Sequence, residues 1–230
     1  MHVTFDDARY EREPWAVSAR GLFTEGIHLV SGDTGSGKTT LALMTAGLLA
    51  PSSGAVMREG ISSLLVSFQF PEHHVTGRTV REECESWGHD PRVIVSETRL
   101  TGKEDLSPLA LSRGELKRLH LACVLSREFD LLVLDEPFSS LDCREKARFC
   151  EVLSRRTRGI TIIFTHEQEH FPRVDRIWEI AEGTLQCRGG IPEALPCWDH
   201  APEVIRALVR QRKIPANLTR KDIVEAACRT

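Results

Sequence analysis

Short, continuous apolar runs recur along the chain, and they have the pattern of strands buried in a parallel sheet. Four such runs are present: IHLV (27–30), LLVSF (64–68), LLVLD (131–135) and TIIFT (161–165). A strand covered on both faces shows no apolar–polar alternation, because neither row of its side chains meets water. We therefore expect each of these runs to form a strand of one parallel sheet.

Helical patterns lie between these runs, notably KTTLALMTAGLLA (38–50) and RGELKRLHLACVLSRE (113–128). Alternation of strands and helices predicts an α/β fold with a doubly wound sheet. Between Pro71 and Pro108 the chain becomes polar and is often interrupted, which indicates a small, mostly helical insertion. Residues 176–187 predict a hairpin turning at Glu182-Gly183. From residue 190 we expect two or three short helices.

The length of 230 residues suits one globular domain. We expect a core at about 1–69 and 127–187, a helical subdomain at about 70–126 and a helical tail at about 188–230. A net charge of −3 gives no general attraction to nucleic acid, so no nucleic-acid partner is expected. Seven scattered cysteines without a C-x-x-C pair are typical of reduced, packed thiols rather than of a disulfide framework or a zinc site.

A glycine-rich segment, GDTGSGKTT (32–40), matches G-x-x-x-x-G-K-[ST] between a predicted strand and a predicted helix. Backbone N–H groups of such a loop surround phosphates, and the following helix adds the positive end of its dipole. The pattern predicts that Lys38 reaches the β- and γ-phosphates and that Thr39 ligates Mg²⁺. A chance glycine-rich turn is the alternative, which the flanking elements disfavour. The nucleotide-binding candidates here are Gly32, Asp33, Thr34, Gly35, Ser36, Gly37, Lys38, Thr39 and Thr40.

Two carboxylates end the run LLVLDEP (131–137). Acidic side chains at the carboxyl end of a parallel strand point into the ligand crevice. We expect Asp135 to hold Mg²⁺ and Glu136 to act as the base, or polarising group, for an attacking water. A strand that simply ends in acidic residues is the alternative, and it is a poor one beside a phosphate loop.

The order of the motifs resembles the nucleotide-binding subunits of ATP-binding cassette (ABC) proteins. The motifs are the phosphate loop, Gln69, LSRGE (111–115), LDEP (134–137), SSLD (139–142) and His166. The resemblance covers residues from about 3 to 185. The stretch FQFPEHH (68–74) is similar to the glutamine loop of the ATPases of energy-coupling-factor vitamin and metal importers.

This resemblance implies a P-loop NTPase (ABC ATPase) core with an inserted small helical subdomain. It also implies ATP hydrolysis with Mg²⁺, a dimer with a second ABC ATPase subunit, integral membrane transport subunits as partners, and a peripheral place on the cytoplasmic face of the membrane. The alternatives are a low-turnover nucleotide-binding partner of an active homologue and a soluble, non-transport ABC ATPase. The soluble class generally carries two cassettes or a long coiled-coil insertion, and this sequence shows neither.

The resemblance also implies roles for individual residues. Gln69 would sense Mg²⁺ and the water, and His166 would hold the γ-phosphate; with Glu136 they form the catalytic set. Mg²⁺ would be held by Thr39, Gln69 and Asp135. Tyr10 lies where the family places an aromatic ring against adenine, although ordinary strand packing explains it nearly as well. The residues that would reach the nucleotide of the opposite subunit, or cross the dimer interface, are Ser112, Gly114 and Asp142.

The signature motif departs from the family form Leu-Ser-Gly-Gly-Gln at Arg113 and Glu115. Ser112 followed three residues later by Glu115 is a capping-box pattern, with Ser112 as N-cap and Arg113 at the first helical position. Ordinary helical dihedrals at that position accept a side chain. We therefore expect an altered but working signature, while a site silenced by Arg113 is the alternative.

Two further patterns admit other functions. HEQEH (166–170) matches the zinc-protease pattern H-E-x-x-H, which requires a sustained helix and a third ligand. Here it follows a predicted strand directly and meets Pro172. The basic stretch RALVRQRK (206–213) predicts a solvated amphipathic helix rather than a lipid or nucleic-acid site.

Overall fold

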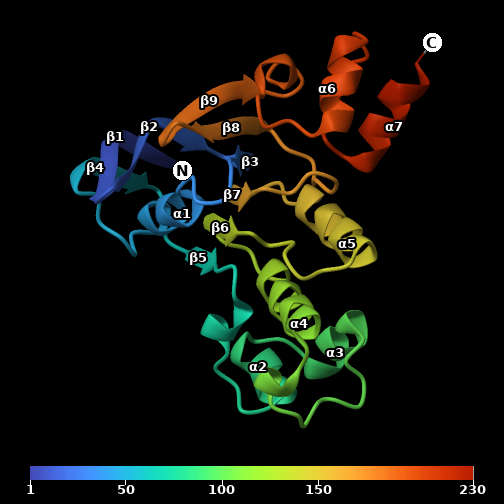
Figure 1. Ribbon diagram of the computed structural model, residues 1–230. Coiled ribbons are helices and arrows are strands. Elements are labelled where there is room, and N and C mark those ends of the chain that lie inside the picture. Colours follow the sequence, from blue (N-terminus) through green and yellow to red (C-terminus); the bar gives the residue numbers. More distant parts are fainter. Residues whose placement is uncertain (230) are drawn as a thin grey trace.

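The computed structural model describes residues 1–229, and its framework is a nine-stranded sheet (Figure 1). The strand order is β4-β1-β2-β9-β8-β3-β7-β6-β5. The strands are β1 (His2–Arg12), β2 (Trp15–Thr24), β3 (Gly26–Ser31), β4 (Ser53–Glu59), β5 (Leu64–Ser67), β6 (Leu131–Asp135), β7 (Ile160–Thr165), β8 (Arg176–Ala181) and β9 (Thr184–Gly190). The four predicted apolar runs form β3, β5, β6 and β7, so that prediction is confirmed.

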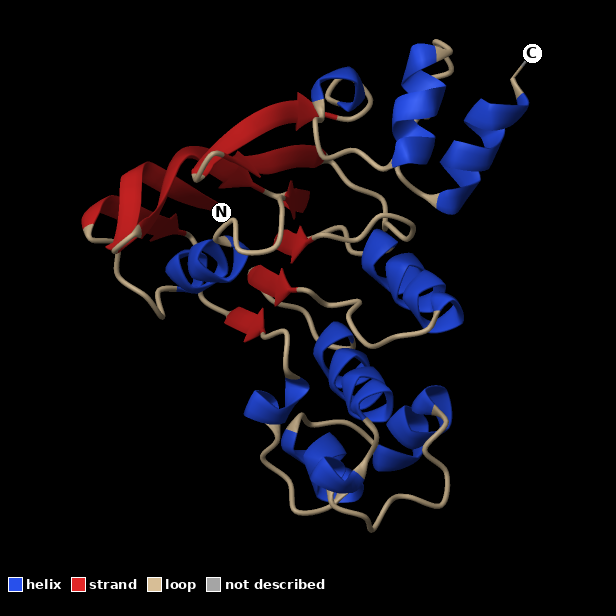
Figure 2. Ribbon diagram, viewed as in Figure 1, coloured by secondary structure: helices blue, strands red, loops and turns tan. Residues whose placement is uncertain are grey.

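The sheet is mixed, because a parallel half and a largely antiparallel half are joined in it. Strands β8, β3, β7, β6 and β5 pair in parallel. The predicted hairpin is confirmed, since β8 and β9 pair antiparallel. Strand β1 pairs antiparallel with both β2 and β4, and this half was not predicted from the sequence. Figure 2 shows this half as the red ribbons at the upper left.

The helices are α1 (Lys38–Ala46), α2 (Val80–Ser86), α3 (Pro91–Thr98), α4 (Arg113–Leu125), α5 (Cys143–Ser154), α6 (Glu203–Arg210) and α7 (Arg220–Cys228), with 3₁₀ turns at Pro71–His74, Pro108–Ala110 and Leu195–Cys197. The predicted helix over 38–50 ends four residues early. Gly47 adopts the left-handed conformation (φ 78°) there and its N–H caps the preceding carbonyls. The helix predicted over 113–128 ends at Leu125.

Two apolar layers cover the sheet, one on each face. Helix α1 packs with the antiparallel strands through Leu41 and Met44, and α5 lies on the opposite face (Figure 1). The second layer includes residues of α4 and α5 together with buried residues of the tail, among them Leu195, Trp198 and Ile205. The tail therefore shares a core with the strands. In α6, Ile205 and Leu208 are buried and Arg206 is exposed, as the amphipathic pattern predicted.

Helix α4 connects the sheet to the helical region between β5 and β6. Its residues Leu121 and Val124 belong to the core beneath the sheet, whereas Leu116 and Leu119 pack with α2 and α3. The helices α2 and α3 form the end of the molecule farthest from the C-terminal tail (Figure 1). The boundary of a helical subdomain near residue 126 remains a prediction, since α4 belongs to both clusters.

Candidate nucleotide site

A cavity of about 590 Å³ opens where the parallel strands end. Loops that follow β3, β5, β6 and β7 all reach this edge of the sheet, as expected at the carboxyl ends of parallel strands. The predicted site residues that line the cavity are Tyr10, Thr34, Gly35, Gly37, Lys38, Thr39, Thr40, Gln69, Glu136 and His166. Sequence reasoning missed Arg12 and Trp15, which also line it.

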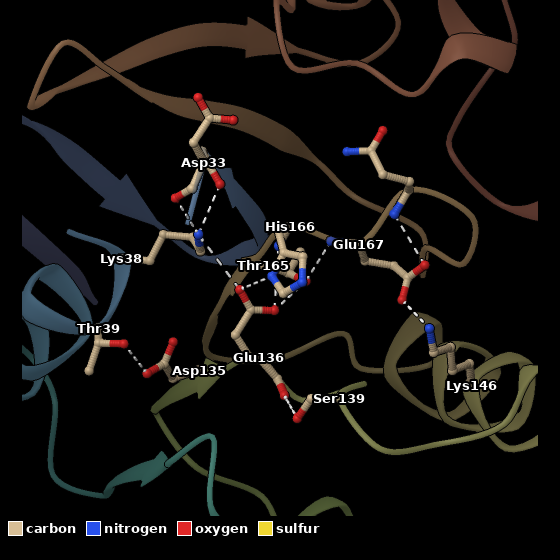
Figure 3. A network of polar contacts seen from close by, with 12 residues as sticks. Asp33, Lys38, Thr39, Asp135, Glu136, Ser139, Lys146, Thr165, His166 and Glu167 are labelled. Carbon is tan, nitrogen blue, oxygen red and sulfur yellow. Dashed lines mark hydrogen bonds and ion pairs between the residues drawn. The ribbon is translucent and has the colours of Figure 1, made fainter. Parts of the chain in front are cut away.

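The phosphate loop holds its lysine in a defined, buried position. Lys38 is 7% exposed, and its Nζ donates hydrogen bonds to the carbonyl oxygens of Gly32 (2.8 Å) and Asp33 (2.9 Å). The same ammonium lies 3.7 Å from Oε1 of Glu136 (Figure 3). Gly37 immediately precedes it with φ 104°, and a Cβ there would lie 2.7 Å from the Trp15 ring. Only glycine fits that position without movement.

Thr39 and Asp135 form the second part of the site. Thr39 Oγ1 donates to Oδ2 of Asp135 over 2.7 Å (Figure 3). The other carboxylate oxygen, Oδ1, is buried and has no hydrogen-bond partner among the described residues. Burial raises the pKa of Asp135, and the nearby Glu136 carboxylate raises that pKa further. A buried carboxylate oxygen without a partner is costly unless another group binds it.

Glu136 lies between the lysine and His166 (Figure 3). Its Oε1 contacts His166 Nδ1 at 2.6 Å, and its Oε2 accepts a hydrogen bond from Thr165 Oγ1 at 3.1 Å. The backbone of Glu136 has φ 47°, a left-handed conformation that is rare for a residue with a Cβ. Such local strain, about 1–3 kcal/mol, is typical of functional positions.

Gln69 follows β5, and the main chain there is held by a buried lysine of α4. Lys117 is 1% exposed, and its Nζ donates to the carbonyl oxygens of Phe68 (3.3 Å) and Gln69 (3.0 Å). Burial lowers the pKa of Lys117 to about 8, although Asp135 and Glu136 oppose this shift. This contact could not be predicted from the sequence, because the two segments are 48 residues apart.

Ser112, Gly114 and Asp142 do not line the cavity of this chain. Ser112 begins α4 in the predicted capping box, since its side chain and that of Glu115 each accept a hydrogen bond from the other's backbone N–H. Asp142 begins α5 and accepts from Glu145 N at 2.8 Å. Both side chains therefore have defined positions. Whether they act on a second subunit remains a prediction.

The negative charge of Glu115 is paired with a lysine of the same chain. Lys103 Nζ lies 2.6 Å from its Oε1. This contact and the hydrogen bond from Ser112 N hold the pKa of Glu115 down, to about 2. A lysine thus partly neutralises the carboxylate that replaces the family's glutamine.

The segment 166–170 is a loop that follows β7, not a helix. His166 contacts Glu136, and His170 lies 4.0 Å from Glu169. The H-E-x-x-H pattern places both histidines one turn apart on a helix, so this segment lacks the geometry of that zinc site.

The family model described as ABC transporter matches residues 22–139. The chain is 34% identical over 220 residues to the energy-coupling factor transporter ATP-binding protein EcfA1 of Thermotoga maritima, covering 84% of this chain and 83% of that protein. It is 29% identical over 228 residues to EcfA2 of the same organism, covering 87% and 86%. A bacterial Atm1-family ABC exporter with ATP bound has a similar fold, with a TM-score of 0.71 and 20% identity over 91% of this chain and 42% of the exporter chain.

The fold and the site therefore define a P-loop NTPase. The chain belongs to the ABC transporter family and is an ATP-binding ATPase subunit of it, most similar to the energy-coupling-factor type. Among the helices of residues 1–229, none is both long and apolar enough to cross a membrane.

Proposed function

We propose that this chain hydrolyses Mg-ATP in a head-to-tail dimer and powers an energy-coupling-factor importer for a vitamin or metal ion. The observation that carries the proposal is one cavity lined by Lys38, Thr39, Glu136 and His166, in a chain similar to EcfA1. Lys38 would exchange its two carbonyl partners for phosphate oxygens. Glu136 would take a proton from, or polarise, the attacking water, with its carboxylate oriented by Thr165 and His166.

The residues present fit a magnesium ion. Within residues 1–229, one buried carboxylate oxygen of Asp135 has no hydrogen-bond partner, and Thr39 Oγ1 lies beside the other oxygen. Oxygen ligands from one carboxylate and one hydroxyl, completed by phosphates and waters, are typical of Mg²⁺ sites in ATPases. When bound, the ion would neutralise charge on the β- and γ-phosphates.

The partners and the location follow from the same proposal. A second ABC ATPase subunit would contribute its Ser112 and Gly114 equivalents to this cavity, and Asp142 would lie near the dimer interface. Membrane subunits would supply the transport path, with this chain bound at the cytoplasmic face. Purification of a tagged chain from native membranes should yield integral membrane subunits in fixed ratio to it. Recovery of the chain without any membrane subunit would contradict the importer role and leave the ATPase role standing.

The hydrolytic step is tested by Glu136→Gln. The amide keeps the size of the side chain but cannot accept a proton, so hydrolysis should fall by about 10²–10⁴-fold. ATP should still bind, because Lys38 and Thr39 are unchanged, and an ATP-bound dimer should accumulate on size-exclusion chromatography.

Glu128→Gln is the matched control, since this exposed glutamate precedes β6 and lies at the opposite end of that strand. It should keep the wild-type rate. Near wild-type hydrolysis by Glu136→Gln would remove Glu136 from the catalytic role.

A second function is favoured by one observation. Arg113 is exposed at the first position of α4, where the family has glycine. A chain silenced by this arginine would serve as the low-turnover partner of an active homologue.

A further inference from the structure

A segment of the C-terminal tail, well after the last ATPase motif in the sequence, packs beside the phosphate loop. Trp198 follows the 3₁₀ turn at Leu195–Cys197 and is 3% exposed. Its Nε1 donates to Oγ of Ser31 over 2.7 Å, and Ser31 immediately precedes the loop. A cavity of about 220 Å³ lies beside this contact, bounded by Asp33, His166, Trp198 and His200 among others. Residues 195–201, which we call the return segment, thus lie against the nucleotide site.

His200 bridges two carboxylates at this place. Its backbone N–H donates to Oε1 of Glu179 over 2.6 Å, and its ring Nδ1 contacts the same oxygen. The other ring nitrogen, Nε2, lies 3.5 Å from Oδ1 of Asp33 in the phosphate loop. Both ring nitrogens therefore face carboxylate oxygens, so the imidazole can donate to both carboxylates when it carries two protons.

A network centred on the buried Glu179 fixes the orientation of this ring. Glu179 is 0% exposed and also accepts from Arg188 Nε at 2.6 Å. Arg188 in turn donates to Asp199 over 2.7 Å. With Asp33, these are the charged groups that face His200 from the phosphate loop, β8, β9 and the return segment. Because Glu179 holds one side of the imidazole, the other side is presented to Asp33.

Asp33 is an unfavourable residue for a loop that binds a triphosphate. Its carboxylate is 87% exposed and points away from Lys38, while its carbonyl oxygen accepts from Lys38 Nζ (Figure 3). A negative charge near the phosphates weakens their binding by Coulomb repulsion. A cation beside that carboxylate reduces the repulsion and also holds the loop.

We propose that His200 is a positioning residue of the ATPase, which holds Asp33 and offsets its charge so that the phosphate loop is ready for ATP. His200 acts through Asp33 and does not touch the nucleotide. The proposal rests on ATP binding at the phosphate loop. Under this proposal the return segment, which continues into α6 and α7, supports the nucleotide site.

The test is a double-mutant cycle on steady-state ATP hydrolysis, with His200→Gln, Asp33→Asn and the double variant. At low ionic strength His200→Gln should raise KM for ATP about two- to fivefold, with kcat within about twofold. Asp33→Asn should lower KM, because the repelling charge is gone. The double variant should match Asp33→Asn. The His200→Gln effect should shrink as salt rises, since the Debye length is about 10 Å at 0.1 M.

His2→Gln is the control, because His2 also faces a carboxylate, Glu59 at 3.4 Å, but lies in β1. It should keep the wild-type KM. An equal rise in KM from His200→Gln in the Asp33→Asn background would show a general structural role and overturn the proposal, as would no rise in either background. If Lys38→Ala lost ATP binding while His200→Gln had no effect, ATP binding by the phosphate loop would stand. Only the positioning role of His200 would be rejected.

Discussion

The surroundings of the Lys38 ammonium suit the binding of an anion. Its ammonium is buried, and two backbone carbonyls and the Glu136 carboxylate surround it. A buried charge requires such partners, since its desolvation costs several kcal/mol. Phosphate oxygens are charged acceptors and bind an ammonium more strongly than carbonyls do. The lysine is therefore stable with these partners, and under the proposed function it exchanges them for phosphate oxygens when ATP enters.

Lys38→Ala should abolish detectable Mg-ATP binding, a loss of roughly a hundredfold or more, because charge-assisted hydrogen bonds to the phosphates disappear. The fold should remain, since Glu136 keeps Thr165 and His166 as partners. Equilibrium dialysis with labelled ATP, together with a thermal melt, measures both. Lys221→Ala, at an exposed lysine of α7, should bind normally. Unchanged ATP affinity in folded Lys38→Ala would reject the phosphate-loop assignment.

At the scale of elements, α4 connects the signature motif to the glutamine loop within one chain. Ser112 and Glu115 cap its start, and within about the first two turns Lys117 and His120 reach the end of β5. His120 Nε2 lies 2.9 Å from Ser67 Oγ, next to the carbonyls that Lys117 binds. A movement of the glutamine loop must therefore displace α4 or break these contacts.

Substitutions at the start of α4 distinguish an active signature motif from one silenced by Arg113. Arg113 is exposed at the first helical position, so Arg113→Gly should change the ATPase rate by less than about tenfold, or ~1.4 kcal/mol of barrier. Gly114→Asp should be far more harmful, because it adds a Cβ and a negative charge. Part of that harm arises within the chain, since a Cβ at Gly114 would lie 3.0 Å from the carbonyl oxygen of Ser140.

Gly114→Ala separates the two causes, because it adds the Cβ without the charge. Steady-state ATPase of Arg113→Gly should stay within about tenfold of wild type. Gly114→Ala should be slower than wild type, and Gly114→Asp should be slower still. A gain of orders of magnitude from Arg113→Gly would instead identify the natural chain as the inactive half of a pair.

Elements and site residues that the sequence predicted are those whose signal is local. The strands β3, β6 and β7 are continuous apolar runs, and the catalytic candidates directly follow them. Strand β1 was missed because its alternation breaks: Val3, Phe5 and Ala8 are all buried, and the register shifts between Phe5 and Ala8. Asp7, within that irregularity, has φ 44°. A bulge of this kind changes which face later residues occupy.

Trp15 and His200 were missed for a different reason. Trp15 reaches the cavity from the start of β2, and His200 reaches the phosphate loop from the return segment. Sheet pairing and packing of the tail place them there, and neither residue belongs to a spacing pattern near the loop. Long-range placement of this kind has no local signal in one sequence.

For the molecule as a whole, two buried histidines and one partly buried histidine set a limit on acid stability. Burial lowers the pKa of His28 to about 4, and burial followed by the charge of Lys117 lowers that of His74 to about 4. The pKa of His120 lies well below its usual value, mainly because of burial. These imidazoles are neutral in the folded protein at pH 7, and His28 accepts a hydrogen bond from Trp178 in that form.

The free energy of unfolding should therefore fall as the pH drops from about 6.5 toward 4. Below 6.5 the unfolded chain binds protons at these histidines while the folded chain does not, so stability rises with pH inside this window and levels off above it. We expect a loss of about 2–4 kcal/mol between pH 6.5 and 5. Urea unfolding at several pH values measures it. His74→Gln should reduce the slope by roughly a third, whereas His2→Gln, at a partly exposed residue of β1, should not. A free energy that stays constant from pH 6.5 to 5 would show that the buried imidazoles take up protons without unfolding.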